Sequence, residues 1–352
     1  MKILCLGAGG FIGSHLACRL LAEGHSVIGV DTQNDKISDF SSNPQFEFIN
    51  KSIGDATLNS EELIRASDLV IDLIAYANPS IYLKSPMDVF RLNFTENLRV
   101  AEYCVLHKKR LIQFSTCEVY GKTPAAILQG KLPDPDNPVY ATFSEDTSDC
   151  ILGPINKHRW IYASAKQLLE RVLHAYGLEG KLNYTIIRPF NFIGPRIDYL
   201  PIEGDGVPRV FSCFLAALIK GTPMKLVDGG SNRRSYTYID DATECIYRIV
   251  QNPGGVCDRQ ILNIGSSQNE VSIRELAEMM LAIYREKYRK PDIPLSPIIS
   301  VTGQEFYGDG YEDCDRRIPD CTKVNKLLGW VPQTGIAELL NRTMNYYVES
   351  GK

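Results

Sequence analysis

The sequence contains no long run of lysine or arginine, no internal repeat and no low-complexity tail. Its formal net charge is −4, which disfavours a nucleic-acid or membrane-surface partner. The apolar N-terminus is interrupted by glycines and has no small-residue cleavage site, so we expect neither a secretion signal nor a membrane span. A length of 352 residues with 44% hydrophobic residues suffices for one large domain and a smaller one.

The sequence also lacks cysteines and histidines at the spacings that are typical of metal sites. The ten cysteines form no CxxC pair, and the histidines form no cluster. Several cysteines stand inside apolar segments, namely Cys5, Cys18, Cys104, Cys213 and Cys245. Small hydrophobic thiols in a reducing cytoplasm explain this distribution better than disulfides or zinc. We therefore expect a cytoplasmic protein without a metal site.

A glycine-rich turn follows the first apolar strand, predicted at residues 3–6, and precedes an amphipathic helix predicted at 14–23. The turn reads Gly7-Ala-Gly-Gly10-Phe11-Ile12-Gly13. Gly7 permits a tight turn, Gly10 lets backbone N–H groups approach a pyrophosphate, and Gly13 allows close helix–strand packing. A structural β-turn is the alternative for the glycines alone. With strand and helix in place, we expect a dinucleotide site.

Asp31 follows the second predicted strand, residues 26–30. Its carboxylate stands where it can accept hydrogen bonds from an adenosine ribose. The same charge would repel the 2′-phosphate of NADP. The sequence therefore favours NAD as the cofactor.

Tyr162 and Lys166 are four residues apart, so a helix would present both on one face. A tyrosine that exchanges a proton during hydride transfer must be partly phenolate near neutral pH, and a neighbouring ammonium favours the phenolate. Spacing alone would favour an ordinary surface pair. Together with the glycine turn, the pair indicates hydride-transfer chemistry.

Strand and helix patterns alternate through the first half, which predicts an α/β fold with a doubly wound parallel sheet, the Rossmann arrangement. Further strands are predicted at 46–49, 69–74, 110–115 and 184–188, and helices at 59–66, 86–107, 161–176, 209–220, 240–251 and 272–289. We expect a cofactor domain from 1–189 and 236–264, and a substrate lobe from 190–235 and 265–352. The Pro/Asp-rich residues 122–151 are either an active-site lid or a disordered linker.

Two side chains follow the predicted strand at 110–115. Thr116 supplies a hydroxyl that can bind a sugar oxygen together with Tyr162, and Glu118 adds a carboxylate that a plain redox enzyme does not need. A buried ion pair explains Glu118 equally well.

Basic residues in the second half of the chain suit the binding of a diphosphate and a carboxylate. The sequence does not show which of them binds which anion. These residues are Arg188, Arg209, Lys225, Arg233, Arg234, Arg316 and Arg317.

The glycine turn, Tyr162-x-x-x-Lys166 and Arg188-Pro-Phe-Asn191 resemble the extended short-chain dehydrogenase/reductase superfamily of nucleotide-sugar enzymes. Further motifs are similar to UDP-glucuronate decarboxylases of the UDP-apiose/UDP-xylose synthase type, and to the decarboxylase domain of the bacterial enzyme that starts 4-amino-arabinose synthesis for lipid A. These motifs are Ser115-Thr-Cys-Glu-Val-Tyr-Gly121, Arg159-Trp-Ile-Tyr162, Lys225-Leu-Val-Asp-Gly-Gly230 and the stretch from Glu305 to Pro319. The resemblance runs through nearly the whole chain.

The resemblance implies roles for individual residues. Tyr162 becomes the base for oxidation at sugar C4, with Lys166 as its electrostatic partner. Glu118 and Arg317 become the acid/base and carboxylate-handling pair, with Cys117 and Arg159 beside them. The residues implied to hold UDP and the sugar are Asn191, Arg209, Lys225, Arg234 and Tyr311. The resemblance also implies a homodimer.

Two positions depart from the family pattern. Apiose-forming members carry a cysteine in an Ile-Cys-Thr-Pro stretch after the fourth strand, where this chain has Tyr76-Ala77-Asn78-Pro79. If that thiol is needed for ring contraction, Ala77 argues against apiose formation. The usual Asp-Ile pair at adenine reads Ser52-Ile53, so adenine recognition would use Ile53 with backbone groups, or Asp55.

The sequence thus predicts an NAD-dependent decarboxylase of a UDP-linked uronic acid, acting through a C4-keto intermediate. Release as the 4-keto-pentose or reduction to UDP-xylose stays open. An epimerase or dehydratase of the same fold is one rival, and a non-catalytic NAD-sensing protein is another. Intact Thr116, Tyr162 and Lys166 argue against the sensor, because binding NAD alone does not require them.

Overall fold

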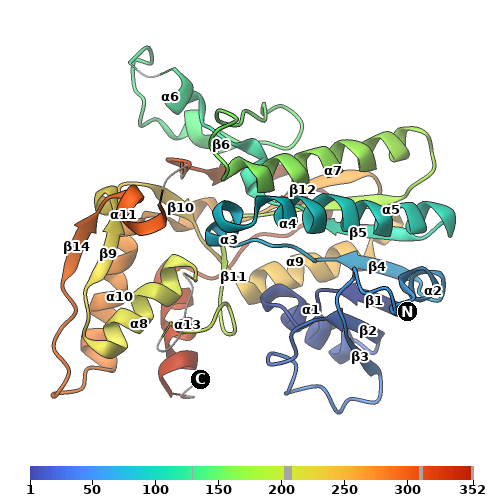
Figure 1. Cartoon of the computed structure of the whole chain (residues 1–352), viewed down its shortest axis with the longest axis horizontal. Coiled ribbons are helices and arrows are strands. Elements are labelled where there is room, and N and C mark those ends of the chain that lie inside the picture. The colour runs from blue at the N-terminus through green and yellow to red at the C-terminus, as the bar shows by residue number, and fades with distance from the viewer. Residues whose placement is uncertain (129, 202–207, 309–311, 350–352) are drawn as a thin grey trace.

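The computed structural model describes residues 1–128, 130–201, 208–308 and 312–349. Figure 1 shows a parallel sheet with helices on both faces, and a smaller group of helices and strands beside it. Within the described residues the sheet has seven parallel strands in the order β12-β7-β5-β4-β1-β2-β3. Their bounds are Gln260–Ile264, Tyr184–Pro189, Arg110–Phe114, Leu69–Asp72, Lys2–Leu6, Ser26–Asp31 and Phe46–Asn50. The expected doubly wound fold is confirmed.

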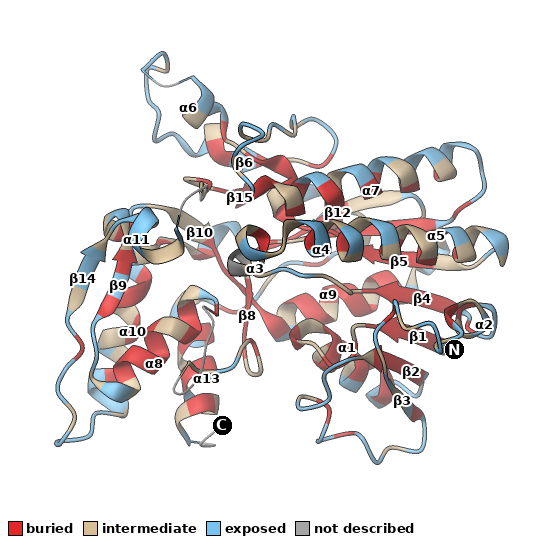
Figure 2. Ribbon diagram, viewed as in Figure 1, coloured by how far each residue is buried: buried red, intermediate tan, exposed pale blue. Residues whose placement is uncertain are grey.

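Two apolar layers bury the sheet, as expected for short apolar strands that are covered on both faces. Helices α1 (Phe11–Ala22) and α9 (Ile239–Gln251) cover one face, and α2 (Ser60–Arg65), α5 (Asn97–Leu106) and α7 (Trp160–Leu178) cover the other. Figure 2 shows the strands as the most continuously buried part of the protein.

Several elements carry no prediction from the sequence, among them α3 (Pro79–Lys84) and α13 (Ile336–Glu349), and two further differences concern the main sheet and a helix beside it. Strand β12 joins the edge of the sheet next to β7, although residues 260–264 carry no strand prediction. The helix expected at 86–107 divides into α4 (Pro86–Phe90), a π-helical segment Arg91–Glu96 and α5. The buried Asn93 amide donates to the carbonyls of Val89 and Tyr76. Such a polar side chain at the backbone accompanies the local change of helix winding.

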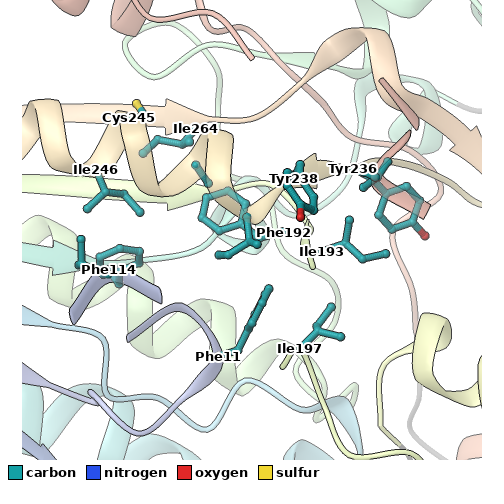
Figure 3. Packing of buried hydrophobic residues seen from close by; sticks show 14 of the residues in the cluster. Phe11, Phe114, Phe192, Ile193, Ile197, Tyr236, Tyr238, Cys245, Ile246 and Ile264 are labelled. Atoms are coloured by element: carbon teal, nitrogen blue, oxygen red, sulfur yellow. The ribbon is translucent and has the colours of Figure 1, made fainter. Parts of the chain in front are cut away.

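The smaller part contains α8 (Val210–Lys220), β9 (Met224–Val227), α10 (Ile273–Lys287), β14 (Ile298–Val301), α11 (Gly303–Tyr307) and α13 (Ile336–Glu349). Phe192, Ile193, Tyr236 and Tyr238 continue the apolar cluster of the α1/α9 face toward this part (Figure 3). One core therefore runs through both parts, and the domain boundaries expected at 189, 235 and 264 stay predictions. None of the helices in the described ranges has the length and apolar content to cross a membrane.

The two ends of the insertion at 122–151 contact each other and the rest of the protein. Gly121 bridges Ile151, and β6 (Thr142–Phe143) pairs with β15 (Ile318–Pro319). Lys122 Nζ contacts Glu312 Oε1 at 2.7 Å, and Arg316 donates to the Asp136 carbonyl at 2.6 Å. Only the segment around α6 (Pro124–Ile127) projects from the body in Figure 1. The base is thus ordered structure rather than a loose linker.

Candidate active site

The glycine turn joins β1 to α1 as expected. Gly7 has φ +90°, and its N–H donates to the Val30 carbonyl at 2.8 Å. A Cβ on Gly13 would lie 2.0 Å from the Gly7 oxygen, so α1 packs directly on the turn. A Cβ on Gly10 would meet the protein only at 3.4 Å or more. The protein itself does not require glycine there, which agrees with space being kept for a ligand.

Asp31 closes the same turn from the end of β2. Its Oδ2 accepts a hydrogen bond from Gly9 N–H at 3.0 Å, and its Oδ1 accepts one from Gln33 N–H at 3.1 Å. A Cβ on Gly9 would lie 1.8 Å from the Gln33 oxygen. Sequence reasoning gave no role to Gly9, because the Gln33 loop approaches it only in the folded chain. The cradle of backbone and carboxylate fits a dinucleotide.

The two adenine candidates have different surroundings. Ile53 is buried in the apolar cluster on the α5/α7 face, and its carbonyl accepts a hydrogen bond from Arg99 at 2.6 Å. Asp55 Oδ1 accepts hydrogen bonds from the Thr57 N–H and hydroxyl, both at 2.7 Å. These bonds lower the pKa of Asp55. They also engage its carboxylate within its own turn.

Tyr162 and Lys166 lie in the first turns of α7, and both are buried beneath the carboxyl end of the sheet. Lys166 Nζ donates to the Phe114 carbonyl at 3.0 Å. Burial lowers the pKa of Lys166 to about 8, against the opposing effect of Asp72 and Glu170. Burial and the charge of Glu118 raise the pKa of Tyr162, while a hydrogen bond with Thr116 acts the other way. Burial and Glu118 thus disfavour the phenolate of Tyr162 in this structure, and the expected phenolate stays a prediction for the protein with its cofactor bound.

Tyr82 is a member of the site that sequence reasoning missed. Its ring stacks on Tyr162 with centroids 4.9 Å apart. Tyr82 belongs to the short helix α3 (Pro79–Lys84), in a stretch where the sequence gave no helix prediction. No local signal distinguishes this tyrosine, because its partner is far away in the sequence.

A cluster of arginines and carboxylates surrounds the turn after β5. Arg159 contacts Glu118 at 3.2 Å and Asp313 at 3.0 Å, and Arg234 contacts Asp313 at 2.7 Å. Although burial opposes it, these arginines and Arg317 hold the pKa of Asp313 well below its usual range. Asp313, which received no role from the sequence, is therefore the ionised link between Arg159 and Arg234.

Arg317 lies in the same cluster with different partners. Its side chain is 2% exposed, and its Nη1 lies 3.8 Å from the Cys117 sulfur. Its Nε has no hydrogen-bond partner among the described residues. Glu118, which the resemblance pairs with Arg317, makes its ion pair with Arg159 instead. Arg317 thus keeps a buried charge that the surrounding side chains satisfy only in part.

The other residues implied to hold UDP are spread along the lobe. Asn191, with φ +40°, donates from its amide to the Ser235 carbonyl at 3.1 Å. The Arg209 guanidinium stands 5.7 Å from the centroid of the Phe11 ring, beside the glycine turn. Lys225 borders a cavity of about 240 Å³ under α8 and Phe306. Tyr311 lies outside the described residues.

Three basic residues with a possible anion role are instead engaged by the protein. Arg188 forms a buried bidentate pair with Glu170 at 2.6 and 3.1 Å. Arg316 forms a similar pair with Glu270, which also contacts Arg233. The described residues contain no group of His, Cys, Asp or Glu side chains arranged for a metal ion.

A glycine turn on a parallel sheet, with a tyrosine and a lysine on the adjacent helix, defines an enzyme of the short-chain dehydrogenase/reductase class. The chain belongs to the NAD dependent epimerase/dehydratase family, whose model matches residues 3–265. This membership confirms NAD as the cofactor and the identification made from the sequence.

The relatives narrow the comparison. The chain is 45% identical to UDP-D-apiose/UDP-D-xylose synthase 1 of Arabidopsis thaliana over 98% of this chain and 91% of the relative. It is also 45% identical to UDP-D-apiose/UDP-D-xylose synthase of Oryza sativa subsp. japonica, over 98% and 89% of the two chains. Among solved structures, the PbgP3 protein from Burkholderia pseudomallei aligns with a TM-score of 0.84 at 34% identity, over 99% of this chain and 96% of that one.

Proposed function

We propose that the protein is an NAD-dependent decarboxylase that converts UDP-glucuronate, through a C4-keto intermediate, into a UDP-linked unbranched pentose. The names of the plant relatives, UDP-D-apiose/UDP-D-xylose synthases, support a UDP-sugar substrate. Whether the pentose leaves as the 4-ketone or is reduced to UDP-xylose is decided by the product analysis below.

The observation that carries the proposal is Arg317. A buried guanidinium is costly unless an anion and hydrogen bonds compensate it. Glu118 is engaged by Arg159, and Asp313 by Arg159 and Arg234. The incompletely satisfied Arg317 therefore suits a carboxylate on the substrate. A uronic acid provides that carboxylate at C6.

The cofactor cradle uses the residues that the turn brings together. Gly7, Gly10 and Gly13 shape the site for the pyrophosphate, and Asp31 faces the adenosine ribose. Phe11 and Ile12 begin α1 behind the turn, and Ile53 is assigned to the adenine end. When bound, NAD supplies the hydride acceptor for C4 oxidation.

The catalytic side chains divide the chemistry between C4 and C5. Tyr162, aided by Thr116 and Lys166, takes the C4 hydroxyl proton as that carbon becomes a ketone. The C4 ketone makes the uronic acid a β-keto acid, so cleavage of the C5–C6 bond releases carbon dioxide and leaves its electron pair as an enolate. Arg317 binds the carboxylate and stabilises the enolate. Glu118, with Cys117 and Arg159 beside it, acts as the acid/base group at C5: its carboxylate takes a proton from water and passes it to C5, which becomes protonated as the enolate collapses to the ketone.

The substrate-holding roles complete the proposal. The residues assigned to holding UDP and the sugar are Asn191, Arg209, Lys225, Arg234 and Tyr311. We also propose a homodimer and a cytoplasmic location, which rest on the family resemblance and on the cysteines.

The test is incubation with NAD and a panel of UDP-uronic acids. Carbon dioxide is trapped, and the sugar product is identified by mass spectrometry and NMR. We expect carbon dioxide and a UDP-pentose from UDP-glucuronate. Stereoisomer interconversion without carbon dioxide would favour the epimerase, and NAD binding without turnover of any sugar would favour the sensor.

A further inference from the structure

Asp72 is a buried carboxylate at the carboxyl end of β4, and the mechanism above does not use it. Its residue is 0% exposed. Oδ1 accepts a hydrogen bond from Ile74 N–H at 3.0 Å, whereas Oδ2 has no hydrogen-bond partner among the described residues. Burial raises the pKa of Asp72, and the charge of Lys166 opposes this rise, together with hydrogen bonds from the Ile74 N–H and the Gln113 side chain.

The strand register places Asp72 beneath α7. Side chains alternate between the two faces of a strand, and Val70, two residues before Asp72, packs in the cluster on the α5/α7 face. Gln113 lies directly opposite Asp72 on β5. The Gln113 amide contacts the Phe114 carbonyl at 3.4 Å, and the same carbonyl accepts the hydrogen bond from Lys166 Nζ. The Phe114 carbonyl therefore links Lys166 to Gln113, the strand neighbour of Asp72, within one buried region.

Among the charged groups in this region, Asp72 is the carboxylate available to the Lys166 ammonium. Asp72 and Glu170 are the carboxylates that interact with Lys166, and Glu170 is already held by Arg188 through two hydrogen bonds. Cys104 packs on the same face of the sheet as Asp72 and Cys5 on the opposite face, and burial raises the pKa of each thiol, so both stay neutral. Asp72 is thus the carboxylate whose charge is left for the Lys166 ammonium.

We infer that Asp72 is a positioning residue for catalysis, which acts through Lys166 by holding its ammonium charged and directed at the tyrosine end of α7. Burial alone favours the neutral amine, and it lowers the pKa of Lys166 to about 8. Without Asp72, the ammonium should persist over a narrower pH range. The inference rests on the proposed function only for the step that Lys166 assists.

The direct test titrates Lys166 by NMR in the full-length protein, without substrate or added dinucleotide. The protein carries ¹³C at the lysine ε-carbons, and Lys166→Arg assigns the signal. We expect Asp72→Asn to move the Lys166 midpoint to lower pH by about one pH unit. Cys104→Ala, which alters the same buried region without removing a charge, should leave the midpoint unchanged. An unchanged midpoint in Asp72→Asn would overturn the inference.

Kinetics supply the second readout. For a midpoint lowered from about 8 by about one unit, kcat of Asp72→Asn should fall about eightfold at pH 8.5 and stay nearly unchanged near pH 6. A merely structural role would lower kcat by one factor at every pH, which contradicts the inference. If Asp72→Asn does not fold, Asp72→Val offers an apolar side chain suited to a buried strand. Because the NMR titration needs no turnover, it stands even if the substrate proves different.

Discussion

The ring of Tyr82 lies nearly parallel to the ring of Tyr162, with 15° between the planes and 4.9 Å between the centroids. Both rings are buried. Tyr162 belongs to α7, and Tyr82 belongs to α3, so the stack joins these two helices. The orientation of the proposed base is therefore shared between two elements.

Replacing Tyr82 tests this support. Tyr82→Phe keeps the stacked ring and should retain activity close to that of the wild type. Tyr82→Leu loses an aromatic contact worth about 0.5–1.5 kcal/mol, which corresponds to about twofold to tenfold in kcat if the contact acts in the transition state. Steady-state kinetics of both variants, with unfolding temperatures as the control, separate orientation from stability. Equal losses in the two variants would point to the Tyr82 hydroxyl instead.

Tyr162→Phe removes the proposed base itself. Without it the C4 hydroxyl proton has no positioned acceptor, and the loss of a general base typically costs about 10²–10⁴-fold in rate. The variant should still bind NAD and UDP-sugar in calorimetry. Turnover within a few-fold of the wild type would mean that another group accepts the proton.

Arg317→Met is expected to abolish carbon dioxide release while NAD affinity stays near normal. Loss of a preorganised group at a developing anion costs about 10²–10³-fold. Arg316→Met is the matched control, because the neighbouring Arg316 is paired with Glu270 and with the Asp136 carbonyl. Carbon dioxide trapping should separate the two variants. Similar losses in both would show that the segment, not the Arg317 charge, matters.

Cofactor choice should depend on Asp31. The carboxylate repels the extra phosphate of NADP, so the wild type should bind NAD more tightly in calorimetry. Asp31→Asn keeps an acceptor for the Gly9 N–H but removes the charge, and NADP affinity should therefore rise relative to NAD. Equal or tighter NADP binding by the wild type would remove the electrostatic argument.

The product should be an unbranched pentose. Ring contraction to apiose requires carbon–carbon cleavage and rejoining, which two thiols near the sugar are expected to assist in the family members that form it. This chain offers Cys117 but has an exposed Ala77 at the second position. NMR should find little UDP-apiose from the wild type and more from Ala77→Cys. UDP-apiose, or its cyclic phosphate breakdown product, as the main wild-type product would show that the second thiol is dispensable.

The sheet was predictable because its signals are local. Five of the six expected strands are apolar runs buried along most of their length, and only the edge strand β3 has an exposed residue, Glu47, between its apolar ones. The glycine turn follows directly from β1. Strand β12 escaped prediction because its identity depends on pairing with β7 at the sheet edge. The π-helical interruption of the helix expected at 86–107 likewise involves a contact from another loop, because the Asn93 amide donates to the Tyr76 carbonyl.

The residues of the charged cluster could be predicted from the sequence, but the ion pairs that they form with one another could not. The resemblance named Glu118, Arg159, Arg234 and Arg317, and the fold brings them into one cluster. Their links run through Asp313, whose ion pairs with Arg159 and Arg234 join residues far apart in the sequence. Similarly, burial and the charge of Glu118 raise the pKa of Tyr162, and neither influence can be read from residue spacing on a helix.

Arg317 stands on a segment outside residues 3–265, the part of the chain that the family model matches. The cofactor cradle, Tyr162 and Lys166 all lie inside that part. The charged cluster is thus assembled from both stretches of the chain, because Glu118 and Arg159 lie inside the matched part whereas Asp313 and Arg317 lie beyond it. A substitution in the later stretch can therefore change the partners of Glu118 and Arg159 while it leaves the glycine turn untouched.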